Sequence, residues 1–241
     1  MRAVLAAPPP TLLVIAKSPV PGRVKTRLTP PYRPEQAAAL AEAALADTLR
    51  TLDTVPAGRR LLVLDGEPGS WLPPGWQVVP QVPGPLDERL AAAFAHAPAG
   101  APALLVGMDT PQLRAGTLAA PLAPGARAGA DAWFGPAADG GFWALGLARP
   151  CAQLAGRLLR GVPMSTGRTG AALLERLAAE GLTVRRLPEL TDVDTAADAA
   201  LVAALAPDGD FAACWRELAA ASEGSGFSEG SGISGASGVA R

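Results

Sequence analysis

The chain has 241 residues, of which 49% are hydrophobic and 18% charged, and its formal net charge at pH 7 is -1. These values are typical of a globular protein and argue against a general nucleic-acid binder, which carries a large positive charge. The length suits one α/β domain with a core that needs no disulfides, and no apolar run approaches the roughly 18 residues of a membrane span. The two cysteines, Cys151 and Cys214, lie too far apart in the sequence to indicate a disulfide framework or a zinc site.

Residues 1–10 are predicted to be an N-terminal extension. Their short apolar patch is interrupted by prolines and is too short for a secretory signal, so we expect a cytoplasmic protein that contacts neither membranes nor nucleic acids. The sequence does not indicate an oligomeric state.

Apolar runs then alternate with Ala- and Leu-rich stretches, which is the pattern of βα units around a mainly parallel sheet. The predicted strands are Thr11–Ile15, Arg60–Leu64, Val78–Val79, Ala103–Val106, Ala130–Phe134, Phe142–Leu147 and Val184–Leu187. The predicted helices are Pro34–Leu52, Leu86–His96, Cys151–Leu159, Thr169–Glu180 and Thr195–Leu205. The link 135–141 is too short for a parallel crossover, so its two strands are predicted to be antiparallel. The expected fold is a single α/β, Rossmann-like domain with a mixed, mostly parallel sheet flanked by helices.

The end of the chain has a different composition. From Ser222 to Val239 a serine stands at every third position and glycine is frequent, which is typical of a flexible linker. We therefore expect the folded domain to span residues 11–218 and residues 219–241 to form a disordered tail.

A basic loop follows the first predicted strand. It contains Lys17, Arg23, Lys25 and Arg27, and Gly22 lies in its turn. Loops at the carboxyl ends of strands in open α/β sheets are where anionic ligands usually bind. The spacing matches neither the P-loop nor the dinucleotide-binding glycine motif. We expect these five residues to bind nucleotide phosphates; the alternative is an exposed basic loop without a ligand.

Asp109 and Asp194 each follow a predicted strand. Asp109 comes shortly after Ala103–Val106, and Asp194 belongs to the acid-rich segment Thr191–Asp198. Magnesium is typically held by one or two carboxylates together with substrate phosphates, so these two residues are candidate ligands of Mg2+ or Mn2+ if their strands converge. The alternative for each is a helix cap: Asp109 before a helix after Pro111, and Asp194 or Thr195 before the helix that follows.

Two further segments are candidate acceptor sites. Asp139, Gly140 and Gly141 form a hairpin turn or, with a ligand close to the backbone, bind a hydroxyl or the metal. Ser165, Thr166 and Arg168 precede a predicted helix, where they either cap it or bind an anionic group of the acceptor.

His96 is the one histidine. We regard it as structural, which excludes most hydrolases that depend on a histidine base.

In this order, the segments resemble the bacterial DUF2064 family of GT-A-like (glycosyltransferase-like) transferases, which is similar to 2-phospho-L-lactate guanylyltransferase. The matching segments are 16–28, 107–111, 135–143, 164–166 and 192–195, within roughly residues 11–205. The chain departs from the family at Met164, where tryptophan is usual, and at Ala196, where proline is usual. The resemblance implies the GT-A fold of nucleotide-diphospho-sugar transferases, a nucleotide over the first half of the sheet and a divalent metal. It matches Asp109 to the metal-binding acid and Asp194 to a second ligand.

These observations favour a metal-dependent transferase that uses an activated nucleotide. The first hypothesis is nucleotidyl transfer from an NTP to a small anionic acceptor, with Lys25 and Asp109 as catalytic residues and pyrophosphate as the leaving group. The second is glycosyl transfer from an NDP-sugar with the same metal site. The third is a nucleotide-binding module without turnover.

Overall fold

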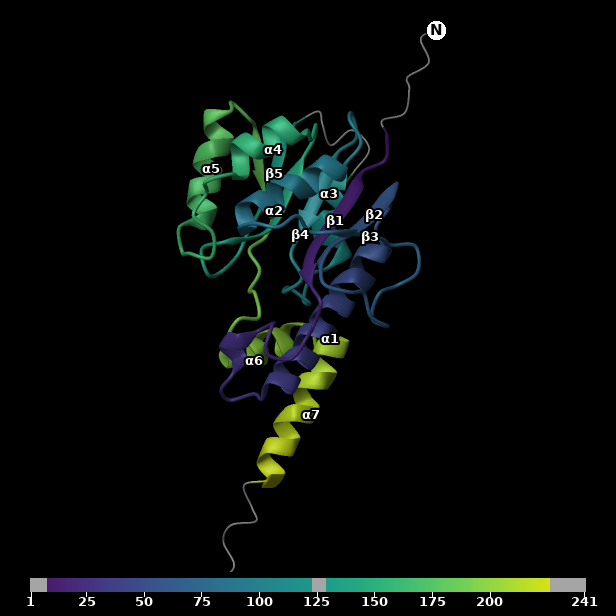
Figure 1. The fold of residues 1–241 in the computed structure, drawn as a ribbon, viewed down its shortest axis with the longest axis vertical. Coiled ribbons are helices and arrows are strands. Elements are labelled where there is room, and N and C mark those ends of the chain that lie inside the picture. Colours follow the sequence, from purple (N-terminus) through teal and green to yellow (C-terminus); the bar gives the residue numbers. More distant parts are fainter. Residues whose placement is uncertain (1–7, 123–128, 226–241) are drawn as a thin grey trace, which may run out of the picture.

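The structure is a computed structural model that describes residues 8–122 and 129–225 (Figure 1). Its strands are β1 (Thr11–Lys17), β2 (Arg59–Asp65), β3 (Gln77–Pro80), β4 (Ala103–Val106), β5 (Ala132–Pro136), β6 (Phe142–Leu147) and β7 (Val184–Arg186). Its α-helices are α1 (Pro34–Asp53), α2 (Leu86–Ala93), α3 (Ala119–Leu122), α4 (Ala152–Leu159), α5 (Thr169–Ala179), α6 (Ala196–Leu205) and α7 (Asp210–Ser225). Short 3-10 helices are η1 (Thr26–Leu28), η2 (Phe94–His96) and η3 (Ala115–Leu118).

The strands form one mixed sheet in the order β3-β2-β1-β4-β6-β5-β7. Strand β6 is antiparallel to β4 and β5, and the other pairs are parallel. This confirms the predicted α/β fold and the predicted antiparallel pair. The chain leaves β1 toward β2 on one side and returns to β4 on the other, so the strand order reverses between β1 and β4.

Helices cover both faces of the sheet. Successive side chains of β1 are buried on opposite faces, each against a different set of helices. Leu12 and Val14 pack in a cluster with α1, whereas Leu13 packs in a cluster with α2, α4 and α5. Figure 1 shows α2, α4 and α5 together on one side of the sheet. Most of the core therefore lies in two layers with the sheet between them.

A third cluster lies beyond one end of the sheet, in the lower part of Figure 1. There α6 and α7 pack on the first half of α1, and Phe211 and Leu40 are fully buried. The cluster also includes Leu28, which follows the basic residues of the first loop, and Val193 from the acid-rich segment. The two loops that carry the candidate site are thus anchored in one apolar cluster.

Helix α7 corrects the predicted boundary of the tail. Residues 219–225 continue the helix that begins at Asp210, so the folded part extends past residue 218. The carboxylate of Asp47 accepts hydrogen bonds from the backbone N–H groups of Asp210 and Phe211, at 3.1 and 2.9 Å, and so caps this helix from α1. The predictions for residues 1–7 and 226–241 lie outside the described residues. No helix in the described residues has the length and apolar character to span a membrane.

Candidate active site

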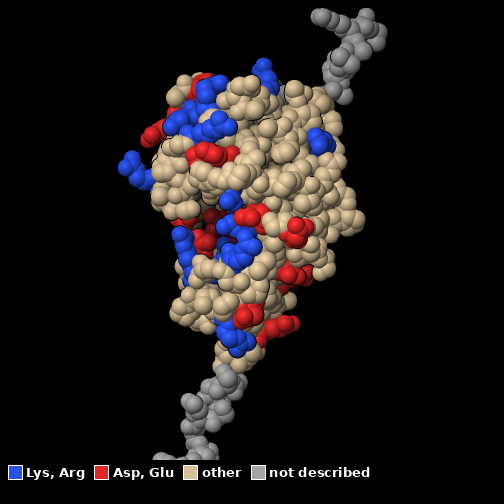
Figure 2. All heavy atoms as spheres, viewed as in Figure 1, with Lys and Arg blue, Asp and Glu red and all other residues tan. Residues whose placement is uncertain are grey.

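Several loops meet at one edge of the sheet, where β1 and β4 end side by side. The basic loop follows β1, the loop with Asp109 follows β4, and the Asp139–Gly141 turn leads into β6 at the same edge. They surround a cavity of about 650 Å³. Figure 2 shows acidic side chains inside a hollow in the middle of the molecule with basic side chains beside them. In open α/β sheets, ligands bind where the strand order reverses, and this is where the cavity lies.

Two buried apolar residues hold the basic loop. Val24 and Leu28 are buried, and the charged residues Arg23, Lys25 and Arg27 line the cavity. The backbone of Lys25 is left-handed, with φ of 47° and ψ of 39°, just before η1 begins. A left-handed conformation is unfavourable for a residue with a Cβ atom and is retained where the surrounding structure enforces it, often at functional sites. Here it directs the Lys25 side chain toward the acids described next.

The Lys25 ammonium lies between two carboxylates that are predicted from the sequence to bind a metal ion. Its Nζ atom is 2.9 Å from Asp109 Oδ1 and 3.2 Å from Asp194 Oδ1, and Arg27 Nη1 is 3.2 Å from Asp194 Oδ2. Only 8% of the Lys25 side chain is exposed. Burial alone would lower the pKa of Lys25, but Asp109 and Asp194 outweigh burial and hold this pKa above its ordinary value. Lys25 is therefore positively charged at neutral pH.

Two hydrogen bonds bring the two acidic loops together. The N–H of Val193 donates to the carbonyl oxygen of Asp109 at 3.0 Å, and Gln112 Nε2 donates to the carbonyl oxygen of Thr191 at 2.7 Å. Neither acid is a helix cap. No α-helix begins directly after Pro111, and the cap of α6 is Thr195, which forms a capping box with Asp198. Asp109 and Asp194 are thus available to the cavity.

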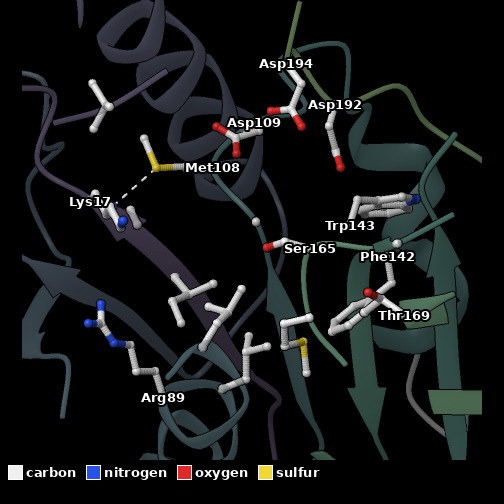
Figure 3. A pocket seen from close by; sticks show the side chains of 18 of the residues that line it. Lys17, Arg89, Met108, Asp109, Phe142, Trp143, Ser165, Thr169, Asp192 and Asp194 are labelled. Carbon is white, nitrogen blue, oxygen red and sulfur yellow. Dashed lines mark hydrogen bonds between the residues drawn. The ribbon is translucent and has the colours of Figure 1, made fainter. Parts of the chain in front are cut away.

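Asp192 is a cavity residue that the sequence did not single out as a ligand. Figure 3 shows its carboxylate near those of Asp109 and Asp194. Burial raises the pKa of Asp192 to about 7, and the negative charges of Asp109, Asp139 and Asp194 add to the rise while Lys25 opposes it. The density of acids in Thr191–Asp198 was the available sequence signal, but it did not show which acid faces the cavity.

The converging carboxylates fit a Mg2+ or Mn2+ ion. Asp109 Oδ1 is a buried atom, and apart from the ion pair with Lys25 it accepts no hydrogen bond from the described residues. Carboxylate oxygens suit these cations, and Mg2+ commonly combines one or two carboxylates with substrate phosphates and water. No group of three or more His, Cys, Asp or Glu side chains in the described ranges is arranged to hold a metal by itself. The geometry suits a metal that binds together with a phosphate substrate.

The turn before β6 and the 163–170 loop form another wall of the cavity. Asp139 Oδ1 accepts a hydrogen bond from the N–H of Gly141 at 2.8 Å, as in a hairpin turn, and Gly170 N–H donates to the carbonyl of Gly140 at 2.8 Å. Gly140 has φ of +86°, and a Cβ atom there would collide with the carbonyl group of Gly167. The glycine is therefore required for the turn to pack on the loop.

The cavity includes most, but not all, of the predicted binding residues. Those that line it are Lys17, Arg23, Lys25, Arg27, Asp109, Asp139, Gly141, Ser165, Thr166 and Asp194. Gly22, Gly140 and Arg168 do not line it. Gly22 has φ of +75° and serves the loop turn, and Arg168 precedes α5 with an exposed side chain.

Other lining residues were not assigned to the site from the sequence: Gln81, Arg89, Met108, Phe142, Trp143, Met164 and Thr169. Gln81 Nε2 donates to the carbonyls of Ala16 and Val63, at 2.7 and 3.1 Å, and its Oε1 accepts from Arg89 Nη1 at 3.3 Å. Arg89 also pairs with Asp65 at 3.0 Å. These contacts join residues 8 to 65 positions apart, and no short sequence motif predicts them.

The mixed sheet and its flanking helices have the GT-A-like fold of nucleotide-dependent transferases. The family model described as "Uncharacterized protein conserved in bacteria (DUF2064)" matches residues 39–166. The chain belongs to this family, as the resemblance in the sequence predicts. A search of the curated proteins found no match.

Solved structures support the same fold. A protein from Desulfovibrio desulfuricans G20, provisionally described as a nucleotide-diphospho-sugar transferase, is 25% identical with a TM-score of 0.74 over 88% of this chain and 95% of that chain. The homologue of Mycobacterium tuberculosis Rv0371c from Mycobacterium sp. strain JC1 is 22% identical, with a TM-score of 0.52 over 82% and 97%. The 2-C-methyl-D-erythritol 4-phosphate cytidylyltransferase of Thermus thermophilus is 18% identical, with a TM-score of 0.51 over 83% and 99%. The last two likenesses concern the fold alone.

Proposed function

We propose that this protein is a metal-dependent nucleotidyltransferase, which transfers a nucleoside monophosphate from an NTP to a small acceptor and releases pyrophosphate. The observation that carries this proposal is the position of Lys25. This buried, charged side chain joins Asp109 and Asp194 at the cavity, beside the further cations Lys17, Arg23 and Arg27. A triphosphate carries enough negative charge to use several of these groups at once.

In the proposed reaction an oxygen of the acceptor forms a bond to the α-phosphorus, and the bond from that phosphorus to the bridging oxygen of pyrophosphate breaks. Negative charge builds up on the phosphate oxygens and the leaving group during this step. Lys25 and Arg27 would neutralise that charge, and because the carboxylates already orient Lys25, little reorganisation is required. Lys17 and Arg23 would hold the outer phosphates.

Asp109 and Asp194 would hold the Mg2+ or Mn2+ ion. When bound, such an ion screens the phosphate charges and aligns the leaving group. Among the described residues the buried Asp109 Oδ1 has no polar partner besides Lys25 Nζ, so this oxygen would still have a lone pair for a cation beside Lys25.

Glycosyl transfer from an NDP-sugar is the second candidate. The Desulfovibrio protein that is 25% identical bears the provisional description of a nucleotide-diphospho-sugar transferase, and this supports the alternative. The same cations and carboxylates would then stabilise a diphosphate as it leaves.

Replacing Lys25 by methionine tests the proposal, because methionine keeps an unbranched side chain but removes the charge. A charge-assisted hydrogen bond contributes about 1.5–3 kcal/mol, so the dissociation constant for NTP with Mg2+ should rise about 10- to 100-fold in calorimetric titrations. Nucleoside monophosphates should lose less affinity. Arg149→Met is the matched control, since Arg149 is exposed and does not line the cavity. Equal losses for mono- and triphosphates would contradict the proposed contact.

The two reactions differ in their leaving groups. Incubation with each NTP, Mg2+ and a broad set of acceptors should release pyrophosphate, and this release should stop in Lys25→Met. If pyrophosphate never forms but UDP or GDP is released from an NDP-sugar, glycosyl transfer replaces nucleotidyl transfer as the function.

A further inference from the structure

The cavity has two walls of opposite chemistry. Within the described residues, all the lysines and arginines that line it are Lys17, Arg23, Lys25, Arg27 and Arg89. The other wall, called here the acceptor wall, consists of Asp139, Gly141, Phe142, Met164, Ser165, Thr166 and Thr169 and contains no cation. In Figure 3, Lys17 and Arg89 lie on the side of the cavity opposite Phe142 and Thr169.

Backbone N–H groups of the acceptor wall are already used within the protein. The N–H of Gly141 donates to Asp139 Oδ1 and that of Gly170 donates to the carbonyl of Gly140, each at 2.8 Å. The N–H groups of Thr166 and Thr169 donate to Thr169 Oγ1 and to the carbonyl of Thr166, at 3.2 and 3.1 Å. The Thr169 hydroxyl itself donates to the carbonyl of Pro163 at 2.7 Å. The first turn of α5 therefore offers an anion few free donors, although helix N-termini often bind anions.

Hydrogen-bond acceptors, in contrast, remain available at this wall. Asp139 Oδ2 has no hydrogen-bond partner among the described residues, and no described donor reaches the carboxylate of Asp192 beside it. Half-buried Phe142 and Met164 provide apolar surface next to these oxygens. A ligand here meets carboxylate oxygens and apolar side chains.

We propose that the acceptor is an uncharged, polyhydroxylated molecule of the sugar or polyol class, which approaches this wall with its hydroxyl groups donating to Asp139 and Asp192. This inference rests on the proposed transferase function and replaces the anionic acceptor expected from the sequence. A phosphate or carboxylate here would meet the carboxylates of Asp139 and Asp192, while the acceptor wall itself provides no lysine or arginine and few free backbone donors. Lys25, whose charge acts on Asp192, is already paired with Asp109 and Asp194, so the anion would be left poorly compensated, which is costly. A hydroxyl that donates to a carboxylate forms a charge-assisted bond, while the carbon skeleton packs on Phe142 and Met164.

In the transfer, one acceptor hydroxyl oxygen forms the bond to the α-phosphorus of the NTP. Pyrophosphate departs with the electron pair of the broken phosphorus–oxygen bond, and the hydroxyl proton passes to the solvent. Atoms and charge balance without an oxidant or reductant.

Matched pairs of compounds test the proposal on the full-length protein. D-glucose is compared with glucose 6-phosphate, and glycerol with glycerol 3-phosphate, by calorimetry with and without saturating NTP and Mg2+. The uncharged member of at least one pair should bind about tenfold more tightly than its phosphorylated partner. Tighter binding of the phosphorylated member in both pairs, or no measurable binding of any of the four, overturns the proposal.

The variant Asp139→Asn tests whether the acceptor wall causes the preference for uncharged compounds. The amide oxygen of asparagine can still accept from Gly141, so the turn is kept, but the negative charge is lost. The preference for the uncharged member should fall about tenfold, whereas Asp208→Asn, at an exposed position outside the cavity, should leave it unchanged. An unaltered preference in Asp139→Asn overturns the assignment.

The proposed function can fail separately. If neither pyrophosphate nor a nucleoside diphosphate is released with any donor, the transferase proposal fails. If the uncharged compounds nevertheless bind more tightly, the inference about the acceptor wall stands.

Discussion

At the residue scale, the central feature is a lysine between two carboxylates from distant parts of the chain. The convergence of Asp109 and Asp194 could be anticipated, because both follow strands of one sheet and the carboxyl ends of parallel strands meet at one edge. The ion pairs of both acids with Lys25 were not predicted. The inward position of Asp192 could not be anticipated, because three acids in one short segment look equivalent in a sequence. The contact between Arg89 of α2 and Gln81, the residue after β3, could not be anticipated either.

Neighbouring residues Asp194 and Thr195 provide a test that separates binding from capping. Thr195→Ala removes the cap of α6 and should cost about 1 kcal/mol of unfolding free energy, without loss of nucleotide affinity. Asp194→Asn should leave the stability nearly unchanged but abolish the effect of Mg2+ on nucleotide binding. Chemical denaturation and calorimetry with Mg2+ or EDTA measure the two properties. The same loss of stability in both variants would show that Asp194 also supports the helix.

At the element scale, most elements could be predicted, because their signals are local. The buried runs Thr11–Ile15 and Ala103–Val106 and the helix that begins at Pro34 all form. Helix α7 was missed, because its first N–H groups are capped by Asp47 of α1, a tertiary contact without a sequence signature. Its end also runs into the Ser- and Gly-rich segment that begins at Ser222, which obscures the helical pattern.

The close packing of the turn before β6 on the 163–170 loop predicts a large effect of a small substitution. Gly140 and Gly181 both have positive φ, at +86° and +69°, but only Gly140 has neighbouring atoms where a Cβ would stand. Alanine at either position should cost about 1–2 kcal/mol for its backbone conformation. Gly140→Ala should cost about 1–3 kcal/mol more, because the loop must move. Urea denaturation of both variants gives this difference, and equal costs would contradict the packing.

At the scale of the whole molecule, stability and the site are linked through the third apolar cluster. Leu28, fully buried there, follows Lys25 and Arg27, and Val193, 1% exposed, lies between Asp192 and Asp194. Helices α6 and α7 thus support both loops that supply the central charges, although they contribute no side chain to the cavity. The helices near the end of the chain therefore help to position the two loops that carry Lys25 and Asp194.

Phe211→Ala tests this link. Phe211 is 1% exposed in the third cluster, and replacing a buried phenylalanine by alanine typically costs about 3–5 kcal/mol. Because Leu28 and Val193 belong to the same cluster, we expect the dissociation constant for NTP to rise and amide exchange to become faster in residues 23–28 and 191–194. Leu158→Ala is the matched control, because Leu158 belongs to α4 and to a different apolar cluster. It should cost about 2–5 kcal/mol of unfolding free energy but leave nucleotide affinity unchanged, since no residue of α4 lines the cavity. If both variants weaken nucleotide binding equally, the effect is one of global stability, and the third cluster does not specifically position the site.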